Sequence, residues 1–265
     1  MASLVPIRRM NIAFHDADRI VGREFSRQST LGLRLLKSYN LHDSCSLMAP
    51  ERWFCNEEWN PTIEEHFFKK LRRARDKVQY LKIQAGCLCK KHPQVALALL
   101  EKFFALDGNS IFRAEAFLHQ AEAHLSLGAK QKAIESFQKA LQRQREFPNV
   151  ITAVWSEYGL LIATEKMSEL FDDALKVLQE HKKRLLLPID QFLWYGIYAL
   201  ITDARGEHQV AKDYAAKALR FSGLTHSGLR HHPKSGLVEA RYESLKATQR
   251  WLAVEVIGSR SMKSA

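Results

Sequence analysis

Apolar and small side chains recur at helical spacing through the middle of this chain. In residues 114–148 the pattern is interrupted once, at Gly128, and it stops before Pro148. Recurrence every three to four residues is typical of an amphipathic helix, and glycine and proline are typical of helix ends. The segment therefore predicts two antiparallel helices joined at Gly128. The residues that carry the pattern are Phe117, Ala121 and His124 in the first half and Ala133, Phe137 and Ala140 in the second.

The same pattern occurs before and after this segment. Corresponding alanines stand at positions 96, 133, 174 and 211, which are 37, 41 and 37 residues apart. The first unit lacks a turn glycine, the third has about three additional residues within 164–170, and the fourth has Gly206 at its turn. Repetition at a fixed period predicts four successive helix pairs.

The unit in residues 114–148 resembles a tetratricopeptide repeat (TPR). That repeat has aromatic and small residues at fixed offsets, a turn glycine and a final proline. Two positions depart from it: His124 stands where tyrosine is usual, and Pro148 comes a few residues late. The resemblance implies an all-α fold, a right-handed α-solenoid of antiparallel helix pairs with helical additions at both ends. It also implies a non-enzymatic scaffold or adaptor that binds a protein partner.

The segments around the repeats predict three regions. Residues 1–60 form an N-terminal extension, partly irregular, whose Trp53, Phe54 and Trp59 favour packing on the first repeat; a partly disordered leader up to about Ser29 is the alternative. Residues 61–221 hold the repeats, and the apolar stripe that follows Asn60 predicts one long helix reaching Leu81. Residues 222–265 form a Gly- and His-rich connection and a capping helix.

Composition narrows the class of protein. No run of about 18 apolar residues occurs, which predicts no membrane insertion. The beginning of the chain lacks a convincing secretory signal, and four cysteines at positions 45, 55, 87 and 89 suggest reduced thiols in a cytoplasmic protein. The net charge of +11 is uneven, because residues 61–100 have nine Lys and Arg against three Asp and Glu, and residues 222–265 have seven against three.

In the resembling family, the first helices of the pairs line a concave groove. Transferred to this chain, the groove is an apolar strip with a few carboxylates, suited to an amphipathic helix or an apolar peptide with some positive charge. The alternative is that the chain's own extensions cover the strip. The predicted partner-binding residues are Leu81, Lys82, Leu118, His119, Glu122, Leu125, Glu157, Leu160, Ile197 and Asp203.

Basic residues suggest a second function, contact with nucleic acid or another acidic partner, within 69–77 and 230–250. Acidic neighbours and the absence of interleaved aromatic residues favour an ordinary solvated helix face instead. The cations concerned are Lys69, Lys70, Arg72, Arg73, Lys77, Arg230 and Lys234.

The sequence predicts no enzyme, cofactor or metal site. Cys87 and Cys89 lie two residues apart beside His92, but residues so spaced on one helix point in different directions and cannot chelate together. His226, His231 and His232 have no evident carboxylate partner nearby in sequence and are predicted to lie in a surface loop.

Overall fold

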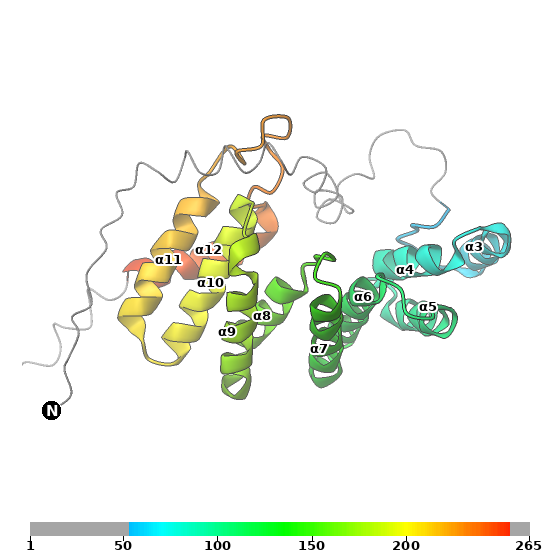
Figure 1. Ribbon diagram of the computed structural model, residues 1–265, viewed down its shortest axis with the longest axis horizontal. Helices are drawn as coiled ribbons and strands as arrows, with labels where there is room; N and C mark the ends of the chain where they lie inside the picture. Colours follow the sequence, from blue (N-terminus) through cyan, green and yellow to red (C-terminus); the bar gives the residue numbers. More distant parts are fainter. Residues whose placement is uncertain (1–52, 255–265) are drawn as a thin grey trace, which may run out of the picture. The chain divides into compact units, whose positions relative to one another are not determined.

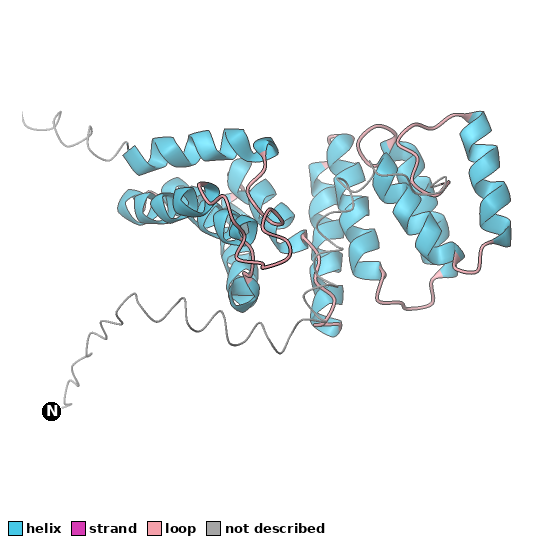
Figure 2. Ribbon diagram, turned by 90° about the horizontal axis from the view of Figure 1, so that it is seen from above, coloured by secondary structure: helices cyan, strands magenta, loops and turns pink. Residues whose placement is uncertain are grey.

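The structure, a computed structural model, describes residues 53–254, and this part of the chain contains ten α-helices and no β-strand (Figures 1 and 2). Predictions for residues 1–52 and 255–265 lie outside it. The helices are α3 (Pro61–Arg73), α4 (Lys77–Leu88), α5 (Pro93–Leu106), α6 (Arg113–Ser126), α7 (Lys130–Glu146), α8 (Val154–Thr164), α9 (Phe171–His181), α10 (Pro188–Ala204), α11 (His208–Ser222) and α12 (Glu243–Val254).

Helices adjacent in sequence pack as pairs. The pairs are α4 with α5, α6 with α7, α8 with α9, and α10 with α11. Each pair also contacts the next, through α5 with α6, α7 with α8, and α8 with α10 (Figure 1). The prediction of an all-helical fold with helices packed in adjacent pairs is confirmed.

Small residues at the pair interfaces are fully buried, which allows the helices to approach closely. In the second pair, Ala121 on α6 and Ala133 on α7 have 0% of their surface exposed. Phe137 is also fully buried, and its ring lies 6.2 Å from that of Tyr158 on α8. The aromatic residue thus joins one pair to the next, while the alanines close each pair.

Two of the turns between paired helices have a glycine where the backbone adopts a positive φ. Gly128 and Gly206 have φ values of 73° and 80°, in the left-handed region that only glycine adopts without strain. Between α8 and α9 the additional residues form a longer turn that contains a 3-10 helix, Ser168–Leu170. The predicted irregularity of the third unit therefore lies in its turn.

The prediction of one long helix after Asn60 is wrong, because α3 ends at Arg73 and α4 begins at Lys77. Ala74 has an extended backbone, with φ −71° and ψ 142°. Asp76 then caps the new helix, since its Oδ1 accepts a hydrogen bond from the Gln79 amide at 3.0 Å. The predicted beginning is confirmed, because the Asn60 side chain caps α3 by accepting from the Ile63 amide.

The prediction of four reduced cysteines is also wrong, because Cys55 and Cys87 form a disulfide. Trp53 and Phe54 pack on the ring of Tyr80 in α4, with centroids 4.9 Å away in both cases. This packing brings Cys55, which directly follows Phe54, next to Cys87 of α4. Cys89 is a buried free thiol, and Cys45 lies outside the described residues.

At the other end, α12 packs on α11 and α10. Gln249 is fully buried there and donates a hydrogen bond from Nε2 to the Gly196 carbonyl of α10, at 3.2 Å. The connection before α12 ends in a 3-10 helix, Ala240–Tyr242. Val238 therefore lies in the connection and not in α12. No helix within residues 53–254 is long and apolar enough to cross a membrane.

Candidate functional site

Five side chains of α4 and α6 form a polar cluster at the place where the first two helix pairs meet. Glu115, His119 and Glu122 are spaced four and three residues apart on α6, which places them on one face of that helix. Lys82 from α4 and Cys89, which caps the end of α4, face them. Sequence reasoning had selected Lys82, His119 and Glu122 for partner binding, and the structure brings these three together.

Gly86 makes room for this cluster. A Cβ atom at Gly86 would lie 2.7 Å from Nε2 of His119, well inside the sum of van der Waals radii. Because Gly86 has no side chain, the imidazole ring can lie directly against α4. A glycine within a helix otherwise lowers stability, so its position opposite His119 has a packing reason.

Lys82 and Glu115 form the buried ion pair of the cluster. Lys82 is only 5% exposed, and its Nζ donates to Oε2 of Glu115. The same ammonium group lies 4.9 Å from the centre of the Phe112 ring, a favourable cation–π distance. These two interactions offset the cost of burying the ammonium group.

His119 lies between two carboxylates. Its Nδ1 is 3.0 Å from Oε2 of Glu122, and its Nε2 is 3.7 Å from Oε1 of Glu115. Burial disfavours the imidazolium form, but hydrogen bonds and charge from Glu115 and Glu122 outweigh it and raise the pKa of His119 to about 9. Burial likewise disfavours ionised Glu115, yet His119 and Lys82 lower the pKa of Glu115 to about 2. At neutral pH His119 is therefore protonated and Glu115 is ionised.

Cys89 completes the cluster as a protonated thiol. Its Sγ lies 3.2 Å from the Ala85 carbonyl and 3.3 Å from the His119 carbonyl. Burial, together with the charge of Glu122, raises the pKa of this thiol well above its usual range. Cys89 is therefore a poor nucleophile in this state.

A charge on α6 also affects a carboxylate on α8. Burial and the neighbouring charge of Glu122 raise the pKa of Glu157 on α8, while Arg241 and Lys90 act in the opposite direction. Charges from three other segments thus act on Glu157: α6, the turn after α4 and the 3-10 helix before α12. Helices α4, α6 and α8 are the first members of three successive pairs.

The predicted partner-binding residues divide by exposure. Leu81, Leu118 and Ile197 are at most 7% exposed and belong to the hydrophobic core, so their side chains are not available to a partner. Leu125 and Leu160 are half-buried, as is Asp203, which pairs with His208 at 2.9 Å. Lys82 is also buried, so a partner could reach Glu122, Glu157, Leu125 and Leu160, but not the whole cluster, without any change in the core.

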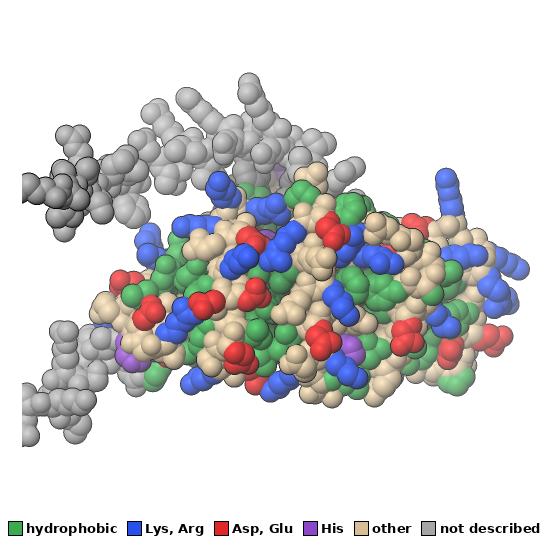
Figure 3. Space-filling model, turned by 60° about the horizontal axis from the view of Figure 1, so that its bottom comes forward, with side chains coloured by type: hydrophobic (Ala, Val, Ile, Leu, Met, Phe, Trp, Pro, Cys, Tyr) green, Lys and Arg blue, Asp and Glu red, His purple; other side chains and the backbone are tan. Residues whose placement is uncertain are grey.

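All seven cations of the predicted basic surfaces are exposed. They lie on α3, at the beginning of α4 and in the connection before α12. On the face shown in Figure 3, Lys and Arg side chains are interspersed with Asp and Glu side chains. Within 230–250, Arg241 pairs with Glu239, and both Lys246 and Arg250 pair with Glu243. The second basic surface is therefore more nearly neutralised than the first.

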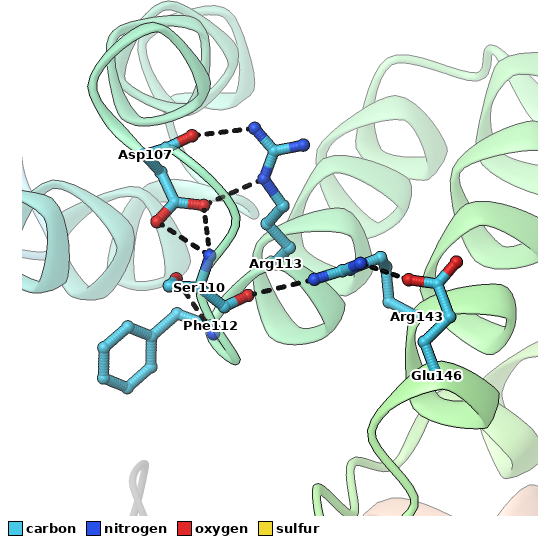
Figure 4. Close-up of polar contacts among 6 residues, drawn as sticks. All are labelled: Asp107, Ser110, Phe112, Arg113, Arg143 and Glu146. Carbon is cyan, nitrogen blue, oxygen red and sulfur yellow. Dashed lines mark hydrogen bonds and ion pairs between the residues drawn. The ribbon is translucent and has the colours of Figure 1, made fainter.

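A second polar network joins the turn after α5 to α6 and α7 (Figure 4). Asp107 is buried, and its Oδ2 accepts from Nε of Arg113 at 2.9 Å, while both of its carboxylate oxygens accept from the Ser110 amide. Arg143 of α7 donates to the Ser110 carbonyl at 3.4 Å and pairs with Glu146. These partners lie within the protein, so the network has a structural role.

Sequence reasoning missed Glu115 and Gly86 as members of the cluster. Glu115 stands four residues before His119, a spacing that could have indicated an interaction on one helix. No signal in the sequence indicates that Gly86 faces His119, since the two lie on different helices. No protein-family model, curated protein or solved structure matches this chain.

Proposed function

We propose that this protein is a non-enzymatic, TPR-like scaffold that binds a peptide or helix of a protein partner, as part of a larger complex. The observation that supports this most is the coupling of Glu122 on α6 with Glu157 on α8. A carboxylate on one first helix whose charge acts on a carboxylate of the next first helix favours a binding face shared by the pairs. Preorganised side chains on packed helices lose little conformational entropy on association.

The chemistry of this face suggests the kind of partner. The charge of Glu122 disfavours ionised Glu157, and a cationic side chain from a partner would offset that repulsion. Leu125 and Leu160, on the same two helices, are half-buried and offer apolar contacts nearby. An amphipathic helix or extended peptide with apolar residues and at least one Lys or Arg has this combination.

Affinity purification from the native source, with quantitative mass spectrometry, tests the proposal. The test variant is Glu122→Lys with Glu157→Lys, which reverses both charges. The matched control is Glu135→Lys with Glu169→Lys, two exposed residues outside the proposed face. We expect at least one protein to be recovered with the wild type and the control and lost with the test variant. Identical sets of proteins from all three would contradict a binding face at Glu122 and Glu157.

A second candidate function is binding to nucleic acid through α3. Lys69, Lys70, Arg72 and Arg73 are exposed, and no ion pair within residues 53–254 involves them. Each phosphate contact would make binding weaken as the salt concentration rises. On double-stranded DNA the logarithm of the binding constant falls with the logarithm of the salt concentration, with a slope of about −0.9 per contact. Titration of labelled DNA and RNA with purified protein, with these four residues changed to Gln as the comparison, distinguishes this function from the first. Equal binding by the two proteins would exclude α3 as the contact.

A further inference from the structure

We propose that Cys89, His119 and Glu122 form a binding site for Zn²⁺. One donor atom from each of the three lies within 4.8 Å of the other two. A thiolate, an imidazole and a carboxylate are ligands that zinc accepts, and a soft sulfur donor with an imidazole disfavours Mg²⁺ and Ca²⁺. Three protein ligands leave one of the four tetrahedral positions to water.

Zinc binding would draw the three donor atoms, now within 4.8 Å of one another, closer together. Zinc bonds of about 2.3 Å to sulfur and about 2.0 Å to nitrogen and oxygen place tetrahedral ligand atoms roughly 3.3–3.6 Å apart. Nδ1 of His119 and Oε2 of Glu122, already 3.0 Å apart, would instead separate slightly to admit the ion. All three ligands belong to two packed helices, because Cys89 caps α4 and the other two lie three residues apart on α6.

Glu115 and Lys82 supply the outer interactions that histidine ligands of zinc usually have. A ligating imidazole generally donates its other N–H to a carboxylate, which fixes the tautomer and the ring orientation. Here Nε2 faces Oε1 of Glu115 at 3.7 Å while Nδ1 faces Glu122. The buried Lys82 in turn pairs with Glu115. This arrangement leaves Nδ1 as the nitrogen that binds zinc.

A metal-free ion cluster accounts for part of this arrangement and not for all of it. His119 between two carboxylates is electrostatically satisfied without zinc. Cys89 contributes nothing to that pairing, yet its sulfur lies within 4.8 Å of a ring nitrogen of His119 and of a carboxylate oxygen of Glu122. A thiol there completes a donor set of sulfur, nitrogen and oxygen, which the ion cluster does not need.

Zinc binding conserves both protons and charge. Zn²⁺ takes the place of the proton on Nδ1 of His119 and the proton on Sγ of Cys89, and both protons leave to solvent. The ion with one thiolate and one Glu122 carboxylate then has no net charge. No oxidation or reduction occurs, and the Cys55–Cys87 disulfide takes no part.

Cobalt substitution gives a direct test on the full-length chain. Cys45 is first changed to Ser, so that Cys89 is the cysteine left outside the disulfide. Titration with Co²⁺ should produce a thiolate-to-cobalt charge-transfer band that saturates at one ion per chain, and added Zn²⁺ should remove it. Cys89→Ser and His119→Gln should abolish the band. His124→Gln, on the same helix but outside the cluster, is the matched control and should leave it unchanged.

A second variant and a second measurement separate metal binding from loss of folding. Glu115→Gln keeps all three ligands and should weaken zinc binding by about 10- to 100-fold in competition with a chelating dye. In the Cys45→Ser protein with no other change, Zn²⁺ should slow the reaction of Cys89 with a thiol reagent and raise the melting temperature. Absence of the cobalt band together with no zinc protection of the thiol would overturn the proposal. A band that persists in Cys89→Ser, with circular dichroism showing a folded protein, would also overturn it.

Discussion

At Gly86, one missing methyl group allows the His119 ring to lie against α4. Replacing Gly86 with Ala would place Cβ 2.7 Å from Nε2, and the ring cannot move away without breaking its interactions with Glu115 and Glu122. We expect Gly86→Ala to lower the free energy of unfolding by about 1–3 kcal/mol, measured by urea denaturation.

Gly108→Ala is the control for this substitution. A Cβ atom at Gly108 would have no atom within 4 Å, and its φ is not in the left-handed region. We expect a change within about 0.5 kcal/mol. A loss at Gly86 no larger than that at Gly108 would contradict contact with His119 as its cause.

Asp107 should make stability depend on acid pH. Burial opposes its ionisation, but the bonds from Ser110 and Arg113 outweigh burial and lower the pKa of Asp107 in the folded protein. A lowered folded pKa adds stability above the ordinary value of about 3.9, and this stability disappears as the pH falls through the folded pKa. Asp107→Asn should therefore cost about 1–3 kcal/mol at neutral pH, by urea denaturation, and progressively less below about pH 4.

The comparison for Asp107 is Asp172→Asn. Asp172 also pairs with an arginine, Arg205, at 2.6 Å, but its side chain is 94% exposed. Exposed ion pairs contribute about 0–1 kcal/mol, so this substitution should have little effect at any pH. A loss for Asp107→Asn that stays constant between neutral and acid pH would contradict the electrostatic explanation.

At the scale of elements, one buried amide adds a hydrogen bond to the packing of α12 on α10 and α11. Gln249 is fully buried and bonds to the Gly196 carbonyl, and a Cβ at Gly196 would lie 3.5 Å from that same amide. Gln249→Ala removes this hydrogen bond and the buried side chain that makes it, and should lower the free energy of unfolding by about 1–3 kcal/mol. Gln209→Ala on the exposed surface of α11 should change it by no more than about 0.5 kcal/mol.

Hydrogen exchange would distinguish local from global effects of Gln249→Ala. If the hydrogen bond from the Gln249 side chain secures α12, amide exchange in Glu243–Val254 should increase more than exchange in α4 and α5. Uniform acceleration through all helices, or none, would contradict this role of Gln249.

Across the whole molecule, the Cys55–Cys87 disulfide joins the N-terminal segment to α4. The two cysteines are 32 residues apart in sequence. In the chain-entropy model a loop of this length stabilises the folded state by about 3–4 kcal/mol. We expect reduction to lower the midpoint of urea denaturation in the wild type and to have no effect on Cys55→Ala with Cys87→Ala.

Peptide mass mapping without a reducing agent checks the bond directly. It should identify one linked pair, Cys55 with Cys87, and an alkylated Cys89. Complete alkylation of Cys55 in the folded protein would contradict the disulfide. It would support the reduced cysteine that the sequence predicts.

Local signals in the sequence were sufficient for the helices and their pairing. Small residues at a period of about 37 residues, with Gly128 and Gly206 at turns, predict paired helices because helix packing and left-handed turns each need particular residue types. The break between α3 and α4 was missed because its apolar stripe continues across Ala74. An N-cap at Asp76 ends that continuity, and aspartate within a basic helix resembles an ordinary surface residue.

Only the tertiary structure decided which polar residues meet. Leu81, Leu118 and Ile197 are themselves predicted groove residues, yet packing between pairs buries them. Cys89 and His119 are 30 residues apart in sequence, and Cys55 and Cys87 are 32 apart. Helical periodicity fixes which face of its own helix a residue occupies. The residue's partner on another helix depends on how far each helix is shifted and rotated against the next, and side-chain packing across the interface sets that.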